Sequence, residues 1–270
     1  MAPHDLDAYL SRLGYIGPRT PTHAVLADVL CRHVSTIPFE NLDVLLGRPI
    51  RTDAASLLQK LVHDRRGGYC FEQNNLLLLA LRALGFTAEP MIARVRWQVP
   101  AETATGLTHM LVRVALDGRA WLADAGMGSL SLTAPLEITD GLEQATPHDR
   151  RRLVRRGELF ALQVFFDGQW LDVNLFHPQT APAVDLEMGN WHSHTHPQAH
   201  FRNNLMVARA TADGRLTLLN REFTVRHREG RSEKHHLATS DELLAVLAEH
   251  FGLQFPADTR FGSPGSPWPH

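Results

Sequence analysis

Residues 108–126 read THMLVRVALDGRAWLADAG, and this stretch decides how the middle of the chain folds. Two runs rich in apolar residues flank Asp117-Gly118, a dipeptide that strongly predicts a two-residue β-hairpin loop. If that dipeptide forms the loop, the strand register makes His109 and Asp124 diagonal neighbours on one face of the hairpin. The opposite face suits a buried core, because it carries Met110, Val112, Val114, Leu116 and Trp121.

An aspartate beside a histidine has a recognised use in catalysis. The carboxylate holds the imidazole in one tautomer and stabilises its protonated form, as the base of a nucleophilic triad requires. Taken singly, His109 also fits a hydrogen-bonded core histidine, and Asp124 also fits a turn or a capping carboxylate. The shared face of the hairpin is therefore the observation that predicts a catalytic pair.

Hydrophobic spacing separates a helical part of the chain from a strand-rich part. Residues 1–85 show mainly helical spacing. Residues 86–185 contain short strand-like runs, such as 91–99, and a second Asp-Gly hairpin signal. We therefore expect helices followed by an antiparallel sheet or a small barrel.

The last part of the chain mixes both kinds of pattern. Residues 186–200 are polar and rich in histidine, which predicts a loop. Short strands follow, and a helix is expected over about 240–251, where acidic residues occupy the first turn. The glycine- and proline-rich tail from residue 262 predicts coil.

Cys70 opens a leucine-rich helix that is predicted over residues 70–84. A helix N-terminus carries partial positive charge and unpaired N–H groups, which lower the pKa of a thiol and can stabilise an oxyanion. A lone cysteine is more commonly a buried structural residue, and we interpret Cys31, inside an amphipathic helix, in that way. Because a nucleophilic cysteine needs a base and an orienting group, the chain order Cys70, His109, Asp124 suits a thiol triad.

Four spaced segments resemble motifs of the arylamine N-acetyltransferase family. Residues 66–74 (RGGYCFEQN) look like the active-site signature of that family, and residues 37–42 (IPFENL) resemble its upstream motif. Residues 108–112 and 123–128 resemble its histidine and aspartate segments. The resemblance covers most of the chain and is weakest in the C-terminal third.

The resemblance implies an α+β fold with three parts. These are a helical N-terminal domain over residues 1–85, an antiparallel β-barrel over 86–185 and a C-terminal α/β lid over 186–270. It implies a triad like that of the thiol proteases, formed by Cys70, His109 and Asp124. It also implies ping-pong transfer of an acetyl group from acetyl-CoA, as co-substrate, to arylamines or arylhydrazines, with a role in xenobiotic metabolism.

The same resemblance implies residues around the triad. It places an ion pair of Arg66 and Glu40 near the nucleophile. Family members often carry an aromatic residue at the position of Met127, and a soft methionine there predicts a broader range of acceptors. The side chains and backbone that would border the acceptor pocket are those of Phe39, Val95, Gly126, Met127 and Phe201.

The composition limits the class of protein. The 270 residues include 44% hydrophobic and 21% charged residues, with a formal net charge of −2 and a pI of about 6.8, as in an ordinary globular protein. There is no long apolar run, no export signal and no cysteine framework, so we expect a cytoplasmic protein. With no strong net charge, we expect neither nucleic acid nor a membrane as partner. The sequence has no glycine-rich phosphate loop, which argues against an enzyme that uses a nucleoside triphosphate or NAD. A homo-oligomer stays open.

Two clusters, one of histidines and one of arginines, indicate other possible sites. Histidines 192, 194, 196 and 200 could bind zinc, copper or nickel, although we expect no metal to be required. Five arginines within residues 150–156 fit a solvated strand edge or hairpin, or less simply a binding patch for CoA phosphates.

Three other functions stay open at this point. A homologous amide synthase would use the same cysteine with another acyl chain. A thiol hydrolase or a transglutaminase-like enzyme would use water or a lysine as the acceptor. If Cys70 were inert, the chain would be a His-rich metal-binding or interaction protein.

Overall fold

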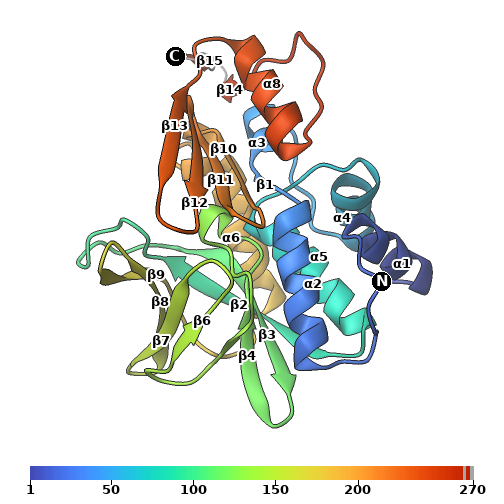
Figure 1. Cartoon of the computed structure of the whole chain (residues 1–270), viewed down its shortest axis with the longest axis vertical. Helices are drawn as coiled ribbons and strands as arrows, with labels where there is room; N and C mark the ends of the chain where they lie inside the picture. The colour runs from blue at the N-terminus through green and yellow to red at the C-terminus, as the bar shows by residue number, and fades with distance from the viewer. Residues whose placement is uncertain (264–265, 268–270) are drawn as a thin grey trace.

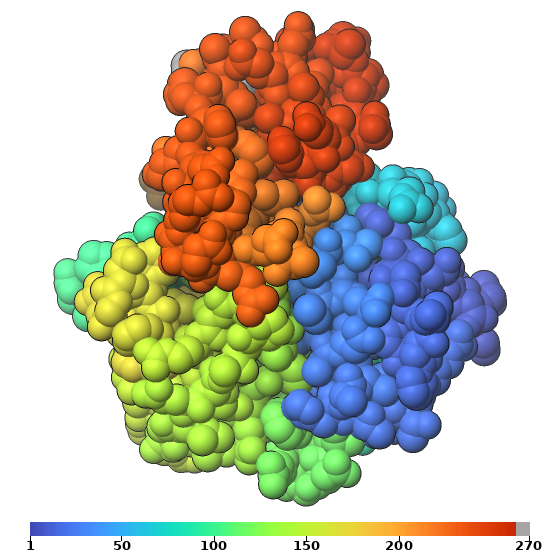
Figure 2. Space-filling view, in the orientation of Figure 1, coloured from blue at the N-terminus to red at the C-terminus, as the bar shows by residue number. Residues whose placement is uncertain are grey.

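The computed structural model describes residues 1–263 and 266–267. Figure 1 shows N-terminal helices in blue beside a strand-rich region in green and yellow, with a second sheet and a helix in orange and red above them. In the space-filling view of Figure 2 the three regions pack against one another. The predicted α+β fold of helices, antiparallel barrel and C-terminal α/β region is confirmed.

The N-terminal region surrounds one central helix. Its elements are α1 (Pro3–Arg12), α2 (His23–Thr36), α3 (Leu42–Leu45), α4 (Ala54–Leu57), the π-helical turn η1 (Leu58–His63) and α5 (Cys70–Ala83). The Thr22 hydroxyl caps α2 by accepting the Val25 N–H. Most residues of α5 are buried, because the helix packs between its neighbours and strands β2 and β3 of the barrel. The first residue of α5 is therefore held at the boundary with the barrel.

Eight antiparallel strands form a nearly closed barrel in the order β5-β4-β3-β2-β9-β8-β7-β6. The strands are β2 (Thr87–Val95), β3 (Leu107–Leu116), β4 (Arg119–Ala123), β5 (Leu136–Glu137), β6 (Glu143–Ala145), β7 (Arg150–Arg156), β8 (Leu159–Phe166) and β9 (Gln169–Phe176), and the 3₁₀ turn η2 (Gly128–Leu130) follows β4. The Gln144 side chain accepts the Glu137 N–H at 2.7 Å and donates to the Glu137 carbonyl at 3.0 Å. This bridge joins the two end strands of the sheet.

The hairpin of β3 and β4 has the register that the sequence predicts. Leu116 pairs with Arg119, and the ladder continues without a shift to Ala123. The loop residues Asp117 and Gly118 have φ values of 52° and 72°, and positive φ at both positions is the type I′ geometry of two-residue hairpins. The second Asp-Gly hairpin joins β8 to β9 in the same way.

The C-terminal region is a five-stranded antiparallel sheet in the order β1-β10-β11-β12-β13. Its strands are β1 (Phe39–Glu40), β10 (Met206–Ala210), β11 (Gly214–Leu219), β12 (Glu222–His227) and β13 (Ser232–His236), and α8 (Ser240–Phe251) packs on it. Because β1 comes from the N-terminal region, the Phe39 segment is fixed within the C-terminal sheet. One hydrophobic cluster includes both the N-terminal helices and the barrel, and the boundaries at residues 85 and 185 stay a prediction.

The prediction of a loop over residues 186–200 is wrong. Most of this segment lies in two helices, α6 (Ala183–Thr195) and α7 (His200–Asn203). The buried positions of α6 are the small residues Gly189 and Ser193, so its packed face shows no apolar periodicity. Its exposed face instead carries Val184, Met188 and Trp191.

The strand predicted over residues 91–99 lies four residues earlier in the chain, as β2. Pro90 fits inside β2 because the strand pairs only with β3 at that point, so the missing N–H of proline breaks no second ladder. The strand ends at Val95, and the following turn contains Gln98 with a φ of 56°.

Of the tail that was predicted as coil, the described residues form the short strands β14 (Gly262–Ser263) and β15 (Ser266–Pro267). Residues 264–265 and 268–270 of that prediction lie outside the described residues. Among the helices of the described part of the chain, none has the length and apolarity needed to cross a membrane.

Candidate active site

Three elements bring Cys70, His109 and Asp124 together. Cys70 begins α5, His109 lies in β3 and Asp124 directly follows β4. His109 Nε2 lies 2.8 Å from Asp124 Oδ2, and the Cys70 thiol donates to the Thr108 carbonyl oxygen at 3.6 Å. The exposed fractions of the three residues are only 2%, 2% and 0%. The His–Asp contact is the one that the hairpin register predicts, and the start of α5 faces the strand that carries His109.

The charges of the three groups support one another. Burial lowers the pKa of His109, but the facing Asp124 carboxylate and the Cys70 sulfur outweigh burial, so the pKa is raised above its ordinary value. Burial opposes the charged form of Asp124, yet His109 and the N–H donors around the carboxylate bring its pKa below the ordinary value. The arrangement favours an imidazolium beside the Cys70 sulfur at neutral pH, the environment that activates a thiol.

A fourth residue, Asn74, fixes the carboxylate of Asp124. Its Nδ2 donates to Asp124 Oδ1 at 2.9 Å and to the Met110 carbonyl at 2.7 Å, and its Oδ1 accepts the Ala125 N–H at 2.8 Å. The role of this residue was not predicted from the sequence. The available signal was its spacing from Cys70, because residues four apart share one face of a helix.

Gly126 lets the loop after β4 approach the start of α5. Its N–H donates to Asp124 Oδ1 at 2.9 Å. A Cβ atom at this position would lie 2.5 Å from Cys70 Cα and 2.8 Å from Asn74 Nδ2. No larger residue fits there without a shift, so the backbone itself forms this wall of the site.

An ion pair lies beneath the segment that leads to Cys70. Arg66 Nη2 and Nε lie 2.7 Å and 3.0 Å from Glu40 Oε1. The same carboxylate oxygen accepts the Gly67 N–H at 3.3 Å, and Asp43 contacts Arg66 at 3.2 Å. Arg66 and Glu40 therefore form the contact that the family resemblance implies, and they tie β1 to the turn before α5.

Lys60, whose role the sequence does not predict, extends this network from η1. Its Nζ lies 2.8 Å from Asp43 Oδ2 and 2.6 Å from Glu72 Oε1. Glu72 in turn accepts the Tyr69 N–H at 3.1 Å, directly before Cys70. Burial raises the pKa of Glu72 to about 6, although Lys60 acts in the opposite direction. The ionic network thus supports the first turn of α5.

Aromatic side chains from three segments gather near the start of α5. The Phe39 and Phe201 rings lie 6.0 Å apart, and the Tyr69 ring lies 5.1 Å from Phe201 in an edge-on arrangement. A Cβ atom on Gly128 would lie 3.5 Å from the Phe39 ring. The structure therefore brings Phe39, Phe201 and the loop of Gly126 to Gly128 to one place.

The two remaining residues of the predicted pocket differ in position. Met127 lies between the two loop glycines and is half-buried against the main hydrophobic cluster. Val95 lies one strand away from His109, two residues beyond Ala93, which is the residue paired with His109. Val95 is therefore farther from Cys70 in the fold than Gly126.

Helix α6 covers the start of α5. The Tyr69 hydroxyl donates to the carbonyl oxygen of Asn190 at 3.3 Å and also to its side-chain oxygen. A Cβ atom on Gly189 would lie 2.6 Å from the Leu107 carbonyl oxygen and 2.8 Å from Phe71 Cζ. This close packing explains how α6 shields the residues on both sides of Cys70 from water.

The second cysteine has different surroundings. Cys31 lies in α2 and is half-buried, and burial raises the pKa of its thiol. Both cysteines are free. Cys31 lies in the interior of α2, whereas Cys70 is the first residue of α5 and contacts His109.

The histidine-rich segment folds as helix. The rings of His192 and His196 stack with centroids 4.6 Å apart, and His194 Nδ1 lies 2.7 Å from the Asn190 carbonyl oxygen. Within residues 1–263 and 266–267, no group of three or more His, Cys, Asp or Glu side chains is placed to hold a metal ion.

The arginine run lies within the barrel sheet, in β7 between β6 and β8. The Arg151 side chain is fully buried, with Nε 2.6 Å from Asp149 Oδ1 and Nη2 3.1 Å from the Leu130 carbonyl. Arg156 pairs with Asp172 at 2.7 Å. The interpretation as a solvated edge is therefore wrong for Arg151, which is a core residue of the barrel.

Comparison with known proteins assigns the family. A family model described as N-acetyltransferase matches residues 22–260. An arylamine N-acetyltransferase of Mycobacterium tuberculosis is 40% identical over 253 residues, covering 92% of this chain and 89% of the relative. The solved enzyme of Salmonella typhimurium has a TM-score of 0.90 at 37% identity, over 98% of this chain and 96% of that one.

A further solved structure contains a ligand. The Mycobacterium marinum arylamine N-acetyltransferase in complex with CoA has a TM-score of 0.88 at 37% identity, and the match covers 92% of each chain. The agreement in sequence and fold extends across the segments that carry Cys70, His109 and Asp124. This chain therefore belongs to the arylamine N-acetyltransferase family and is an acyltransferase.

Proposed function

We propose that this enzyme transfers an acetyl group from acetyl-CoA, through a thioester on Cys70, to the nitrogen of arylamines or arylhydrazines. The observation that carries the proposal is the 2.8 Å contact of His109 with Asp124 directly beside Cys70 at the start of α5. The names of the relatives and the CoA complex of the M. marinum enzyme support this choice of substrates.

In the first half-reaction the Cys70 thiolate attacks the carbonyl carbon of the acetyl thioester. The tetrahedral intermediate collapses with cleavage of the bond to the CoA sulfur, which takes a proton from the His109 imidazolium. The N–H groups of Cys70 and Phe71 open α5, where a helix leaves N–H groups without intrahelical acceptors, and they suit the oxyanion. Because one thioester replaces another, the step costs little free energy.

In the second half-reaction the amine nitrogen attacks the acetyl group on Cys70. Neutral His109 takes the proton that the nitrogen loses, the bond to the Cys70 sulfur breaks, and the thiolate returns with the amide as product. Asp124 occupies Nε2 of the ring, so Nδ1 is the nitrogen that serves the sulfur and the amine. Asp124 thus acts as an orienting group in both halves.

We place the acceptor pocket at the cluster of aromatic side chains. We assign its walls to Phe39 and Phe201, whose rings can pack edge-on or offset against an aromatic amine. Gly126 and Met127 form the wall next to the sulfur, and Val95 the more distant border. The flexible Met127 side chain adapts to acceptors of different shape.

The burial of the triad favours transfer over hydrolysis. The acetylated sulfur would lie beneath α6, in a place that is almost closed to solvent. Water then competes poorly with an amine that the aromatic side chains bind. All polarising groups of this mechanism are side chains or backbone N–H groups, so we propose that no metal is required.

The compartment and the partners of the enzyme are also proposed. Both cysteines are free thiols, which supports a reducing compartment. We therefore place the enzyme in the cytoplasm, where it would act on xenobiotic amines and needs only small-molecule partners, as a monomer or a homo-oligomer.

Isotope exchange tests the ping-pong order. The enzyme is incubated with acetyl-CoA and labelled CoA in the absence of any amine. Label is expected to appear in acetyl-CoA, because the first half-reaction is reversible and complete in itself. The Cys70→Ser variant should lose the exchange. If labelling required an amine, the acetyl-cysteine intermediate would be refuted in favour of direct transfer.

A further inference from the structure

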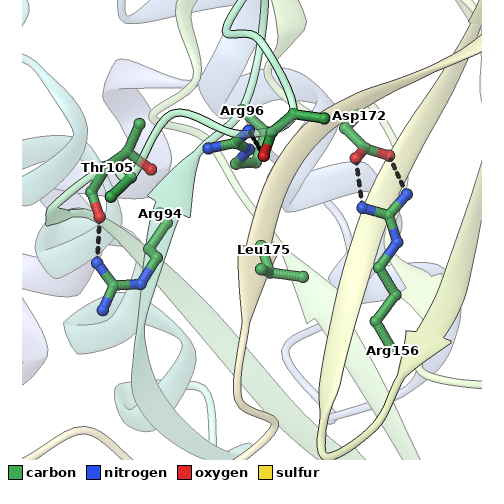
Figure 3. A pocket seen from close by; sticks show the side chains of 8 residues that line it. Arg94, Arg96, Thr105, Arg156, Asp172 and Leu175 are labelled. Carbon is green, nitrogen blue, oxygen red and sulfur yellow. Dashed lines mark hydrogen bonds and ion pairs between the residues drawn. The ribbon is translucent and has the colours of Figure 1, made fainter.

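A pocket of about 290 Å³ lies outside the proposed active site (Figure 3). It is formed by the end of β2, the loop after it, and residues of β7 and β9. On the ladder of β2 and β9, Ala93 pairs with Phe176 and Arg94 pairs with Leu175. Successive residues of a strand point to opposite faces, and Ala93 is the residue paired with His109. The pocket with Arg94 and Leu175 therefore lies on the other face of β2 from the triad.

The pocket carries an excess of positive charge. Three guanidinium groups line it, those of Arg94, Arg96 and Arg156, whereas Asp172 is the one carboxylate among the lining residues. Three positive charges and one negative charge leave a net charge of +2. An anion in this pocket would thus meet a locally positive surface on a chain whose total charge is slightly negative.

Two of the arginines are held in place without being neutralised. Arg94 donates to the carbonyl oxygen of Thr105. Arg96 donates from Nη1 to the Thr103 carbonyl at 2.5 Å and from Nη2 to the Pro100 carbonyl at 2.6 Å. Carbonyl oxygens orient a guanidinium group but leave its full charge, so these side chains are already ordered for a ligand.

Two further groups complete the lining. Arg156 forms two parallel hydrogen bonds with Asp172, at 2.7 Å and 3.0 Å. The buried hydroxyl oxygen of Thr105 has no hydrogen-bond partner within the described part of the chain. A buried hydroxyl without a partner is costly, and an oxygen atom of a bound ligand would satisfy it.

We propose that this pocket binds a phosphate group. The net charge of +2 matches a phosphate dianion, and the planar donor forks of arginine match its oxygen atoms. The phosphate can come from two sources, inorganic phosphate or the phosphate groups of a CoA thioester. The second source rests on the proposed function, and the first does not.

Calorimetric titration of the full chain with inorganic phosphate at low ionic strength tests the site. Arg94→Gln should weaken binding about tenfold, the usual effect of losing charge-assisted hydrogen bonds. Asp172→Asn should strengthen binding, because it frees the fork of Arg156. The control is Arg155→Gln, since Arg155 lies in β7 over the Phe160 ring and does not line the pocket. It should bind phosphate as the unaltered protein does.

Opposite signs for the two pocket variants would be hard to explain by misfolding. The proposal is overturned if the unaltered chain does not bind phosphate, or if Arg94→Gln binds it equally well. It is also overturned if Asp172→Asn weakens binding. Added neutral salt should reduce the affinity, since the charges are close to solvent.

Kinetics then identify the source of the phosphate. If CoA supplies it, Arg94→Gln raises KM for acetyl-CoA and leaves KM for S-acetyl-N-acetylcysteamine, a thioester without phosphate, unchanged. If inorganic phosphate is the ligand, both KM values stay the same while calorimetry still shows weaker binding. Failure of the proposed function would appear differently, as absence of turnover with both thioesters while phosphate binding persists.

Discussion

Asp124 receives hydrogen bonds from three residues, the His109 ring, the Asn74 amide and the Gly126 N–H. The Asn74→Ala variant removes one donor and leaves the carboxylate freer to turn. We expect kcat to fall about 10- to 100-fold, because a hydrogen bond to a charged group contributes about 1.5–3 kcal/mol. KM for acetyl-CoA should change little, and steady-state kinetics measure both constants.

The neighbouring asparagine provides the control for that experiment. Asn75 donates to the Phe71 carbonyl at 2.9 Å and makes no contact with Asp124 in the structure described here. Asn75→Ala should keep most of the activity while it changes the same helix. Equal losses in the two variants would show that Asn74 matters only for the stability of α5.

At the scale of elements, the close packing of α6 determines how well the site excludes water. The Gly189→Ala variant adds a methyl group 2.6 Å from the Leu107 carbonyl, so α6 must move away. We expect slower acetyl transfer and faster alkylation of Cys70 by a bulky reagent. Ser193→Ala is the matched control, because it removes a 2.7 Å hydrogen bond to Gly189 within the helix without adding volume. Unchanged alkylation in Gly189→Ala would contradict the role of α6 as a cover.

The elements also differ in how far the sequence predicts them. The turn at Asp117 and Gly118 is local chemistry, and a correct turn sets the register that joins His109 to Asp124. Helix α6 is not predictable in this way, because its buried face consists of Gly189 and Ser193. Its packing partners lie far away in the chain. The same limit applies within the site. The helix that begins at Cys70 is predictable from the sequence. The ion pair of Lys60 becomes evident only when η1 is placed against α5.

At the scale of the whole molecule, Asp149 joins the barrel to the C-terminal sheet. It lies 2.6 Å from Arg151 in β7 and 2.9 Å from Arg215 in β11. Burial opposes its ionisation, but the two arginines lower its pKa below the ordinary value. The charged form therefore stabilises the fold at pH values above the unfolded pKa of about 3.9, and this contribution is lost as the pH falls through the lower folded value.

The Asp149→Asn variant tests this connection. It leaves two arginines without their carboxylate, so we expect the free energy of unfolding at pH 7 to fall by about 3–5 kcal/mol, the usual range for a broken buried pair. Below about pH 4 the variant should lose less further stability than the unaltered protein. Denaturant unfolding at several pH values measures both effects. Asp167→Asn, in an exposed hairpin turn, should change neither of them.

Intact mass measurement shows whether an acetyl group forms on Cys70. The protein is exposed briefly to acetyl-CoA without an amine, its mass and its modified peptide are determined, and an aromatic hydrazine is then added. We expect a gain of one acetyl group, on Cys70 and not on Cys31, which disappears with the hydrazine. No gain of an acetyl group, with Cys70 still reactive toward alkylating reagents, would refute the acetyl-cysteine intermediate.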